Sequence, residues 1–134
     1  MESGLDNLKH AAACLRAAKN VVVFTGAGIS AESGIPTFRD SDGLWQRFSP
    51  ERFATWDGLL KTAVADPRLF ADFLIAVLDP IAVAAPNAGH LAVAELERHL
   101  PVTVITQNVD GLHQAAGSTT VHEVHGSIFE IVTL

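Results

Sequence analysis

The chain has 134 residues, a net charge of −6, and 49% hydrophobic residues. This length suits one domain with a real core, and the acidic balance excludes a general nucleic-acid or anionic-membrane surface. The single cysteine excludes an internal disulfide and an internal Cys-x-x-Cys zinc site, and it is consistent with a cytoplasmic location. The most apolar stretch, near residues 69–85, is interrupted by charges and a proline, so we expect no membrane span.

The first quarter of the chain predicts a helix, a strand and a glycine turn. Residues 3–18 place apolar side chains at helical spacing, and the β-branched run over 21–25 predicts a buried strand. A Gly-x-Gly-x-x-Ala turn follows directly at 26–31, which is the fingerprint of a dinucleotide-binding turn. Its glycines let the backbone approach a pyrophosphate, and we expect a short helix over 31–34 to follow.

A long crossover comes next. Residues 36–50 are punctuated by proline, glycine and aspartate, which predicts a loop that could act as a mobile lid beside the turn. We expect a helical insertion over about 51–99. Asp66 caps one of its helices, which Pro80 is expected to end or kink, and Asn87 caps a further helix.

Three more strands are predicted in the last third of the chain, over 101–106, 121–124 and 128–134. Strands alternating with helices indicate an α/β fold with a parallel sheet. A standard dehydrogenase brings its second strand and its ribose-binding acid about 20 residues after the glycines. The second strand comes much later here, so the spacing argues against hydride transfer.

Polar side chains follow the second predicted strand at once, at Gln107, Asn108 and Asp110. Ligands of open parallel sheets bind beyond the carboxyl ends of the strands, so this cluster and the glycine turn should face one crevice. The cluster suits ribose hydroxyls and a carboxamide, although Asn108 and Asp110 could instead simply cap the next helix. His125 lies at the end of the third predicted strand, and the histidine side chain is the usual general base at physiological pH, which makes His125 a candidate for that role.

Four separated motifs resemble the sirtuin family, the NAD-dependent protein lysine deacylases. They are residues 26–30, 34–39, 106–113 and 125–126, in the family's order and at about its spacing. The resemblance runs from about residue 20 to about 127. It implies a Rossmann-like sheet, NAD as the cofactor, acyl-lysine proteins or peptides as substrates, and release of nicotinamide and acyl-ADP-ribose.

The resemblance also implies individual roles. The 26–30 turn would hold the pyrophosphate, Phe38 would shield the reacting sugar carbon, and Arg39 would order the cofactor loop. Asn108 would contact the nicotinamide ribose and share the catalytic site with the general base, His125. The carboxamide would be held by the two residues that follow Asn108. The predicted cofactor-binding set is Gly26, Ala27, Gly28, Ser30, Phe38, Arg39, Gln107, Asn108, Val109 and Asp110.

Two positions bear on the acyl group. The motif at 32–39 looks like the sirtuin branch that includes desuccinylases, which reads acidic acyl groups with a Tyr-x-x-Arg pair. Counted back from Pro86, those positions hold Leu74 and Val77. Neither side chain can form a charge-assisted bond to a carboxylate, so we predict a preference for neutral acyl groups. The alternative interpretation of Leu74 and Val77 is plain helix packing.

The resemblance is to the N-terminal, cofactor-binding part of a sirtuin only. The family continues into a four-cysteine zinc module and further strands, which this sequence does not contain. Zinc is therefore implied by the family without ligands for it here. We expect residues 1–134 to be a partial Rossmann-like domain with an unpaired sheet edge, completed by a missing C-terminal half or by a partner chain.

Two other functions use the same residues. An NAD hydrolase or ADP-ribosyltransferase would employ Asn108, Asp110 and His125 without acyl-lysine. A non-catalytic fragment would bind NAD and release no nicotinamide. Product analysis distinguishes both from a deacylase.

Overall fold

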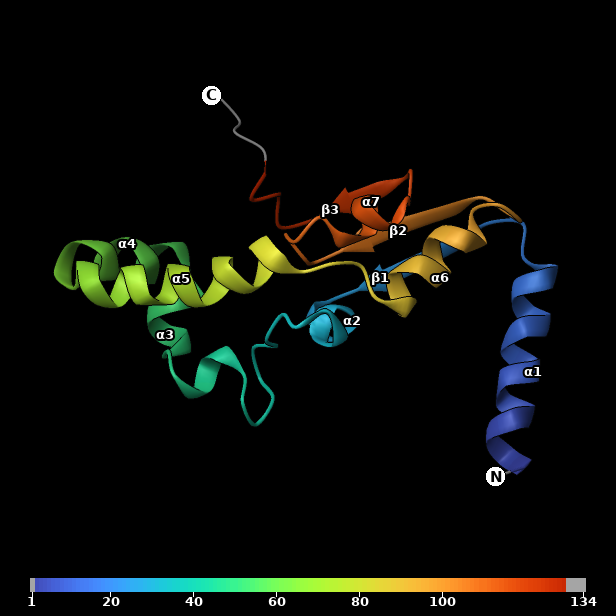
Figure 1. Ribbon diagram of the computed structural model, residues 1–134, viewed down its shortest axis with the longest axis horizontal. Helices are drawn as coiled ribbons and strands as arrows, with labels where there is room; N and C mark the ends of the chain where they lie inside the picture. The colour runs from blue at the N-terminus through green and yellow to red at the C-terminus, as the bar shows by residue number, and fades with distance from the viewer. Residues whose placement is uncertain (1, 130–134) are drawn as a thin grey trace.

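The computed structural model of the chain describes residues 2–129. A small sheet lies in the middle of an elongated molecule (Figure 1). A lobe of three helices, α3 (Pro50–Phe53), α4 (Trp56–Ala65) and α5 (Pro67–Val83), extends from one end. Helix α1 (Glu2–Ala17) stands off the other end. The lobe and the sheet meet where the functional site is found.

The sheet contains three parallel strands in the order β1-β2-β3: β1 (Val21–Thr25), β2 (Val102–Thr106) and β3 (Val121–Glu123). The β-branched runs form these strands, and alternate side chains of β2 are buried, as expected of strands in a core. The register pairs Thr25 with Thr106, so the carboxyl ends of β1 and β2 lie side by side. This arrangement confirms the predicted α/β class and parallel sheet.

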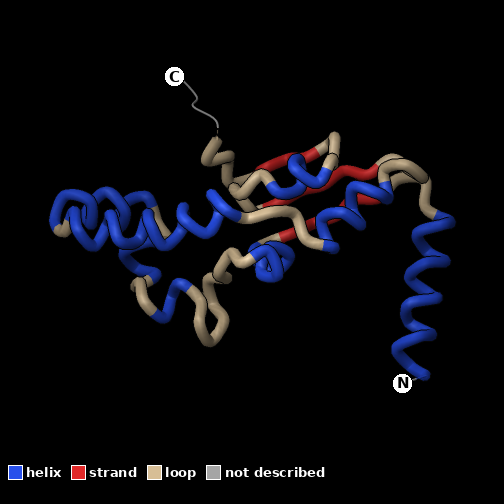
Figure 2. Tube along the Cα trace, viewed as in Figure 1, coloured by secondary structure: helices blue, strands red, loops and turns tan. Residues whose placement is uncertain are grey.

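Helices occupy most of the remaining chain (Figure 2). Several begin at a side-chain cap: Asp66 accepts from the Leu69 amide at 3.1 Å, and Asn87 forms a capping box with His90. The shorter helical elements are α2 (Ala27–Ser30), η1 (Ala31–Ser33), η2 (Leu44–Gln46), α3 (Pro50–Phe53) and α7 (Leu112–Ala116). The longer ones beyond α1 are α4 (Trp56–Ala65), α5 (Pro67–Val83) and α6 (Ala88–Leu96).

Aromatic side chains hold the helical lobe together. Phe53 stacks on Phe73 with ring centroids 4.3 Å apart, and Phe48 meets both rings edge-on. Leu44 completes this buried cluster, and Val77 packs against it. The cluster therefore fixes η2 against α5.

The sheet is covered unevenly in the described part of the chain. Val22 and Phe24, on one face of β1, are exposed, and so are Leu5 and Leu8 of α1. Parallel sheets are normally buried on both faces. This exposure fits the expectation of a partial Rossmann-like domain.

One predicted helix boundary was wrong, and of the two alternatives predicted for Pro80, a helix end or a kink, the structure excludes the helix end. The first helix after the glycine turn begins at Ala27 instead of residue 31, because Gly26 adopts an extended conformation and caps it directly; residues 31–33 form the 3-10 turn η1. Pro80 does not end α5, which continues to Val83. A proline this close to a helix end removes a single hydrogen bond, and burial of Ile81 stabilises the last turn.

Two further expectations concern the loop and the last strand. The predicted 36–50 loop contains the 3-10 turn η2, and α3 begins at its end. Of the predicted strand over 128–134, residues 128–129 form a turn and the rest lie outside the described residues.

Among the described helices, none alone is long and apolar enough to cross a membrane; α5 and α6 reach that length and composition only together, bent by 60°.

Candidate active site

A cavity of about 150 Å³ lies beyond the carboxyl ends of β1 and β2. An adjoining cavity of about 550 Å³ shares Phe38, Asn108 and His125 with it and adds Gly28 and Arg39. The two cavities adjoin, because these shared side chains line both of them. The smaller cavity is lined by Ala27, Ser30, Ile35, Pro36, Phe38, Leu44, Val77, Ile81, Gln107, Asn108, Val109, Asp110 and His125.

Buried hydrogen bonds join the two strand ends beneath the smaller cavity. The Ser30 hydroxyl donates to Asp110 Oδ2 at 2.7 Å, and Asn108 Nδ2 donates to Ser30 Oγ at 3.1 Å. Asn108 Nδ2 also donates to the Gly26 carbonyl at 3.1 Å. Because a carbonyl only accepts, this contact fixes the amide orientation. Both Asn108 amide hydrogens are thus used inside the protein, which leaves Oδ1 as the acceptor for a ligand hydroxyl.

Asp110 keeps acceptor capacity for a ligand. Its Oδ1 accepts from the Leu112 amide at 3.0 Å and its Oδ2 from Ser30. A carboxylate offers about four lone-pair sites, so one remains on each oxygen. The side chain is buried and lines the smaller cavity. Asp110 is therefore placed to accept an N–H from a bound amide.

His125 is positioned as a base. It is exposed and lines both cavities. Its Nδ1 lies 3.0 Å from the Gln107 carbonyl oxygen, which can only accept, so Nδ1 carries the proton of the neutral ring. Nε2 then holds the free lone pair, which is the state that a general base requires.

The loop after η1 forms a wall of both cavities through Phe38. Its ring lies 5.0 Å from the Trp45 ring, and the Phe38 carbonyl accepts from the Trp45 amide. Gly43 is required for this fold of the loop, because a Cβ there would lie 2.8 Å from the Phe38 carbonyl group. Arg39, the next residue, lines the larger cavity.

Two buried histidines support the strand ends from below. The rings of His90 and His113 meet edge-on with centroids 4.9 Å apart. His90 accepts the Asn87 amide on Nδ1 and places Nε2 3.5 Å from Ser30 Oγ. Burial lowers the pKa of His90, and burial together with His90 lowers the pKa of His113; Asp110 partly offsets both effects.

This pair makes stability depend on pH. The two histidines have lower pKa values in the folded chain than in the unfolded chain. As the pH falls through about 6.5, the unfolded chain therefore binds more protons on them than the folded chain does. We therefore expect the free energy of unfolding to be constant above about pH 7.5 and to fall as the pH is lowered toward about 5.5. Urea denaturation across this range measures it, and His113→Gln, which removes one titrating group, should flatten the slope. Equal stability at the two ends of this range would contradict the expectation.

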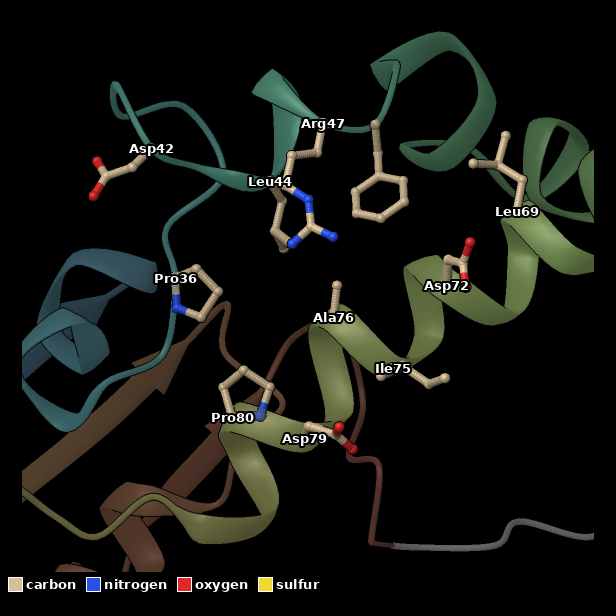
Figure 3. Close-up of a pocket in the computed structure, with 11 residues that line it drawn as sticks. Pro36, Asp42, Leu44, Arg47, Leu69, Asp72, Ile75, Ala76, Asp79 and Pro80 are labelled. Atoms are coloured by element: carbon tan, nitrogen blue, oxygen red, sulfur yellow. The ribbon is translucent and has the colours of Figure 1, made fainter.

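A larger groove of about 700 Å³ lies between the loop and α5 (Figure 3). Arg47 projects into it opposite Asp72 and Asp79, above an apolar floor. Pro36 and Leu44 line both this groove and the smaller cavity. The residues lining the groove include neither a histidine nor a side-chain amide, so the chemistry belongs to the smaller cavity.

The sequence model of the Sir2 family matches residues 26–133 of the chain. The chain belongs to the Sir2 family. Among its relatives, the NAD-dependent protein deacylase 2 of Archaeoglobus fulgidus is 51% identical over 124 residues, which are 92% of this chain and 47% of the relative. That of Pyrobaculum aerophilum is 52% identical over 86% of this chain and 45% of its own length. The chain thus spans about half the length of the Sir2 proteins it matches.

Solved Sir2 structures share the fold. One, described as the structural basis for the mechanism and regulation of Sir2 enzymes, has a TM-score of 0.76 at 50% identity and covers 92% of this chain and 47% of its own. A Sir2 homologue in complex with NAD has a TM-score of 0.71 at 45% identity, over 85% of this chain and 43% of its own.

Most of the sirtuin-derived site residues come together in this structure. Every predicted cofactor residue lines one of the two cavities except Gly26, whose carbonyl instead anchors Asn108. The two acyl-group positions separate: Val77 lines the smaller cavity, whereas Leu74 is 37% exposed and lines neither cavity. Within the described residues, no cluster of histidine, cysteine and carboxylate side chains could hold a metal ion.

Several residues of this Sir2 site were not predicted. Ile35, Pro36, Leu44 and Ile81 supply the apolar wall of the smaller cavity. Ile35 and Pro36 belong to the 34–39 motif, but no role in the site was assigned to them. Leu44 and Ile81 come from η2 and α5, far from the polar cluster in sequence, and no short motif connects them to it. His113 was not predicted as a site residue either, and its ring lies within hydrogen-bond distance of Thr25 at the end of β1.

Proposed function

We propose that this chain is the cofactor-binding part of an NAD-dependent protein lysine deacylase. The observation that carries the proposal is the small cavity that brings a buried acceptor, Asp110, an oriented amide, Asn108, and an accessible base, His125, to one place. The relatives named NAD-dependent protein deacylases and the Sir2–NAD complex support it. The single cysteine supports a cytoplasmic location.

The residues of the chain fit NAD. The smaller cavity suits one aromatic ring bearing an amide, because its wall is apolar and its floor offers the spare lone pairs of Asp110. The larger cavity begins at Gly28, where a Cβ would meet no atom within 4 Å, so the backbone there is open to a phosphate group. When bound, NAD supplies the sugar carbon that accepts the acyl oxygen once nicotinamide has left.

The mechanism assigns each side chain one task. Asp110 accepts from the carboxamide N–H and thereby orients the ring. Oδ1 of Asn108 accepts from a ribose hydroxyl, and its amide hydrogens keep it rigid against Gly26. The Phe38 ring covers the reacting face and excludes water. His125 Nε2 accepts the ribose hydroxyl proton during acyl transfer.

The acyl group is proposed to be neutral. Leu74 and Val77 stand where the acid-reading pair would stand, and both are apolar, so neither offers a cation to an acyl carboxylate. A carboxylate there would lose its hydration without gaining a cationic partner. A Sir2 neighbour solved with a deacetylated p53 peptide and 3'-O-acetyl ADP-ribose, with a TM-score of 0.76 at 36% identity, supports acyl-lysine peptides as the substrate class.

Mass-spectrometric product analysis tests the proposal. The chain is incubated with NAD alone, with NAD and an acetyl-lysine peptide, and with NAD and a succinyl-lysine peptide of the same sequence. We expect peptide-dependent acetyl-ADP-ribose and at least about tenfold less product from the succinyl peptide, since a charge-assisted bond contributes about 1.5–3 kcal/mol. Comparable turnover of the two peptides would contradict the acyl preference.

The other outcomes identify the two competing functions. ADP-ribose formed without peptide would favour an NAD hydrolase or ADP-ribosyltransferase, which needs the same three polar residues. Bound but intact NAD would favour a non-catalytic module, or a site completed only by the rest of the fold or by a partner chain.

A further inference from the structure

We propose that His113 is a positioning residue of the cofactor site, which holds the carboxyl ends of β1 and β2 at a fixed spacing. His113 lines neither cavity, so any effect on NAD must act through other residues. The inference rests on the proposed function only for the choice of ligand in its test.

The decisive contact joins distant parts of the chain. His113 Nε2 lies 2.9 Å from Thr25 Oγ1, across 88 residues of sequence. Both side chains are buried, at 1% and 9% exposure. Thr25 is the last residue of β1 and precedes the first glycine of the cofactor turn. The contact therefore fixes the point from which that turn starts.

A second set of bonds completes a closed ring. Asn108 binds the Gly26 carbonyl in front of the strand ends, and Asp110 accepts from the Leu112 amide at the start of α7. His113 is the next residue of α7 and returns to Thr25 at the back. The segments after β1 and after β2 are thus tied together on both sides. Displacing either segment would move Asn108 relative to the glycine turn.

Packing alone does not account for an imidazole at this position. Its Nδ1 has no hydrogen-bond partner in the described part of the chain, and burying an unpaired polar atom costs free energy. A leucine would fill similar space without that cost. What the imidazole adds is the bond to Thr25, together with the edge contact to His90, which itself approaches Ser30.

Hydrogen exchange and NAD binding measured on the same variants test the proposal. We expect Thr25→Val and His113→Leu each to speed amide exchange over residues 26–30 and 108–112 and to weaken NAD binding by about tenfold. The double variant should be no worse than the poorer single one, because both remove the same bond. His113→Gln, whose amide can reach Thr25, should restore NAD binding to within about twofold of the original chain.

Ser118→Ala is the matched control. Its hydroxyl is buried just beyond α7 and has no partner in the described part of the chain, and its backbone amide donates to the His113 carbonyl. We expect this variant to leave exchange over 26–30 and NAD binding unchanged.

The following results would show that His113 has only a structural role and does not position the cofactor site. If His113→Leu lowers the melting temperature but leaves exchange over 26–30 and the NAD Kd unchanged, the proposal is overturned. If His113→Leu does not fold, Thr25→Val compared with Thr25→Ser decides, and identical exchange in those two variants overturns it. If the original chain binds no NAD, the proposed function fails, while the exchange data still decide the role of His113.

Discussion

Replacing His125 by alanine should lower turnover of an acetyl-lysine peptide by about 10²–10⁴-fold, the usual contribution of a general base. NAD affinity should change by less than about twofold, because the side chain is exposed and, in the part of the chain that the structure describes, is hydrogen-bonded only to the Gln107 carbonyl. Acetyl-ADP-ribose formation measures the turnover, and calorimetric NAD binding measures the affinity separately.

His122→Ala is the control for this experiment. His122 is also exposed, on β3, three residues earlier, and it lines neither cavity. Its replacement should leave turnover unchanged. If His125→Ala keeps full turnover, or if its NAD affinity falls in parallel with its rate, the assignment of Nε2 as the base is wrong.

The sheet and the polar part of the site could be predicted because their signals are local. Runs of β-branched residues form β2 and, with Phe24 among them, β1, almost to the residue, since such a run has few alternatives in a core. Gln107, Asn108 and Asp110 directly follow β2, so the strand end places them. His125 lies two residues after the end of β3, in the turn that follows the strand.

The apolar wall could not be predicted because it depends on packing between distant segments. Leu44 and Val77 approach the cavity only because the aromatic cluster fixes η2 against α5. Leu74 and Val77 lie three residues apart on α5, and helical spacing alone could not say which of them faces the cavity. Val77 lines the cavity and Leu74 does not.

The hydrogen bonds that tie the ends of β1 and β2 together could not be predicted either, because they too depend on packing between distant segments. Thr25 and His113 have no shared motif, and their contact requires that β1 and β2 be paired in their actual register. The start of α2 was predicted wrongly because a helix that begins at Ala27 requires Gly26 to be extended. A glycine in a loop can adopt many other conformations, so the sequence alone does not specify this one.

The lobe therefore carries part of the function, and removing its central ring should show this. Phe73→Ala should lower the free energy of unfolding by about 3–5 kcal/mol, as expected for an aromatic side chain deleted from a packed core. Phe73 is buried, stacks on Phe53 at 4.3 Å and meets Phe48 edge-on at 5.3 Å. Urea denaturation followed by circular dichroism measures the loss.

The same variant should weaken NAD binding, because Leu44 and Val77 lose the packing that holds them at the cavity. Trp56→Ala in α4 is the matched control: its ring is 82% exposed, so we expect a change within about 0.5 kcal/mol and unaltered NAD affinity. If Phe73→Ala destabilises the chain while NAD affinity stays unchanged, the lobe is a structural appendage and the cavity wall does not depend on it. If both fall together, the lobe is part of the binding site in the energetic sense as well as the geometric one.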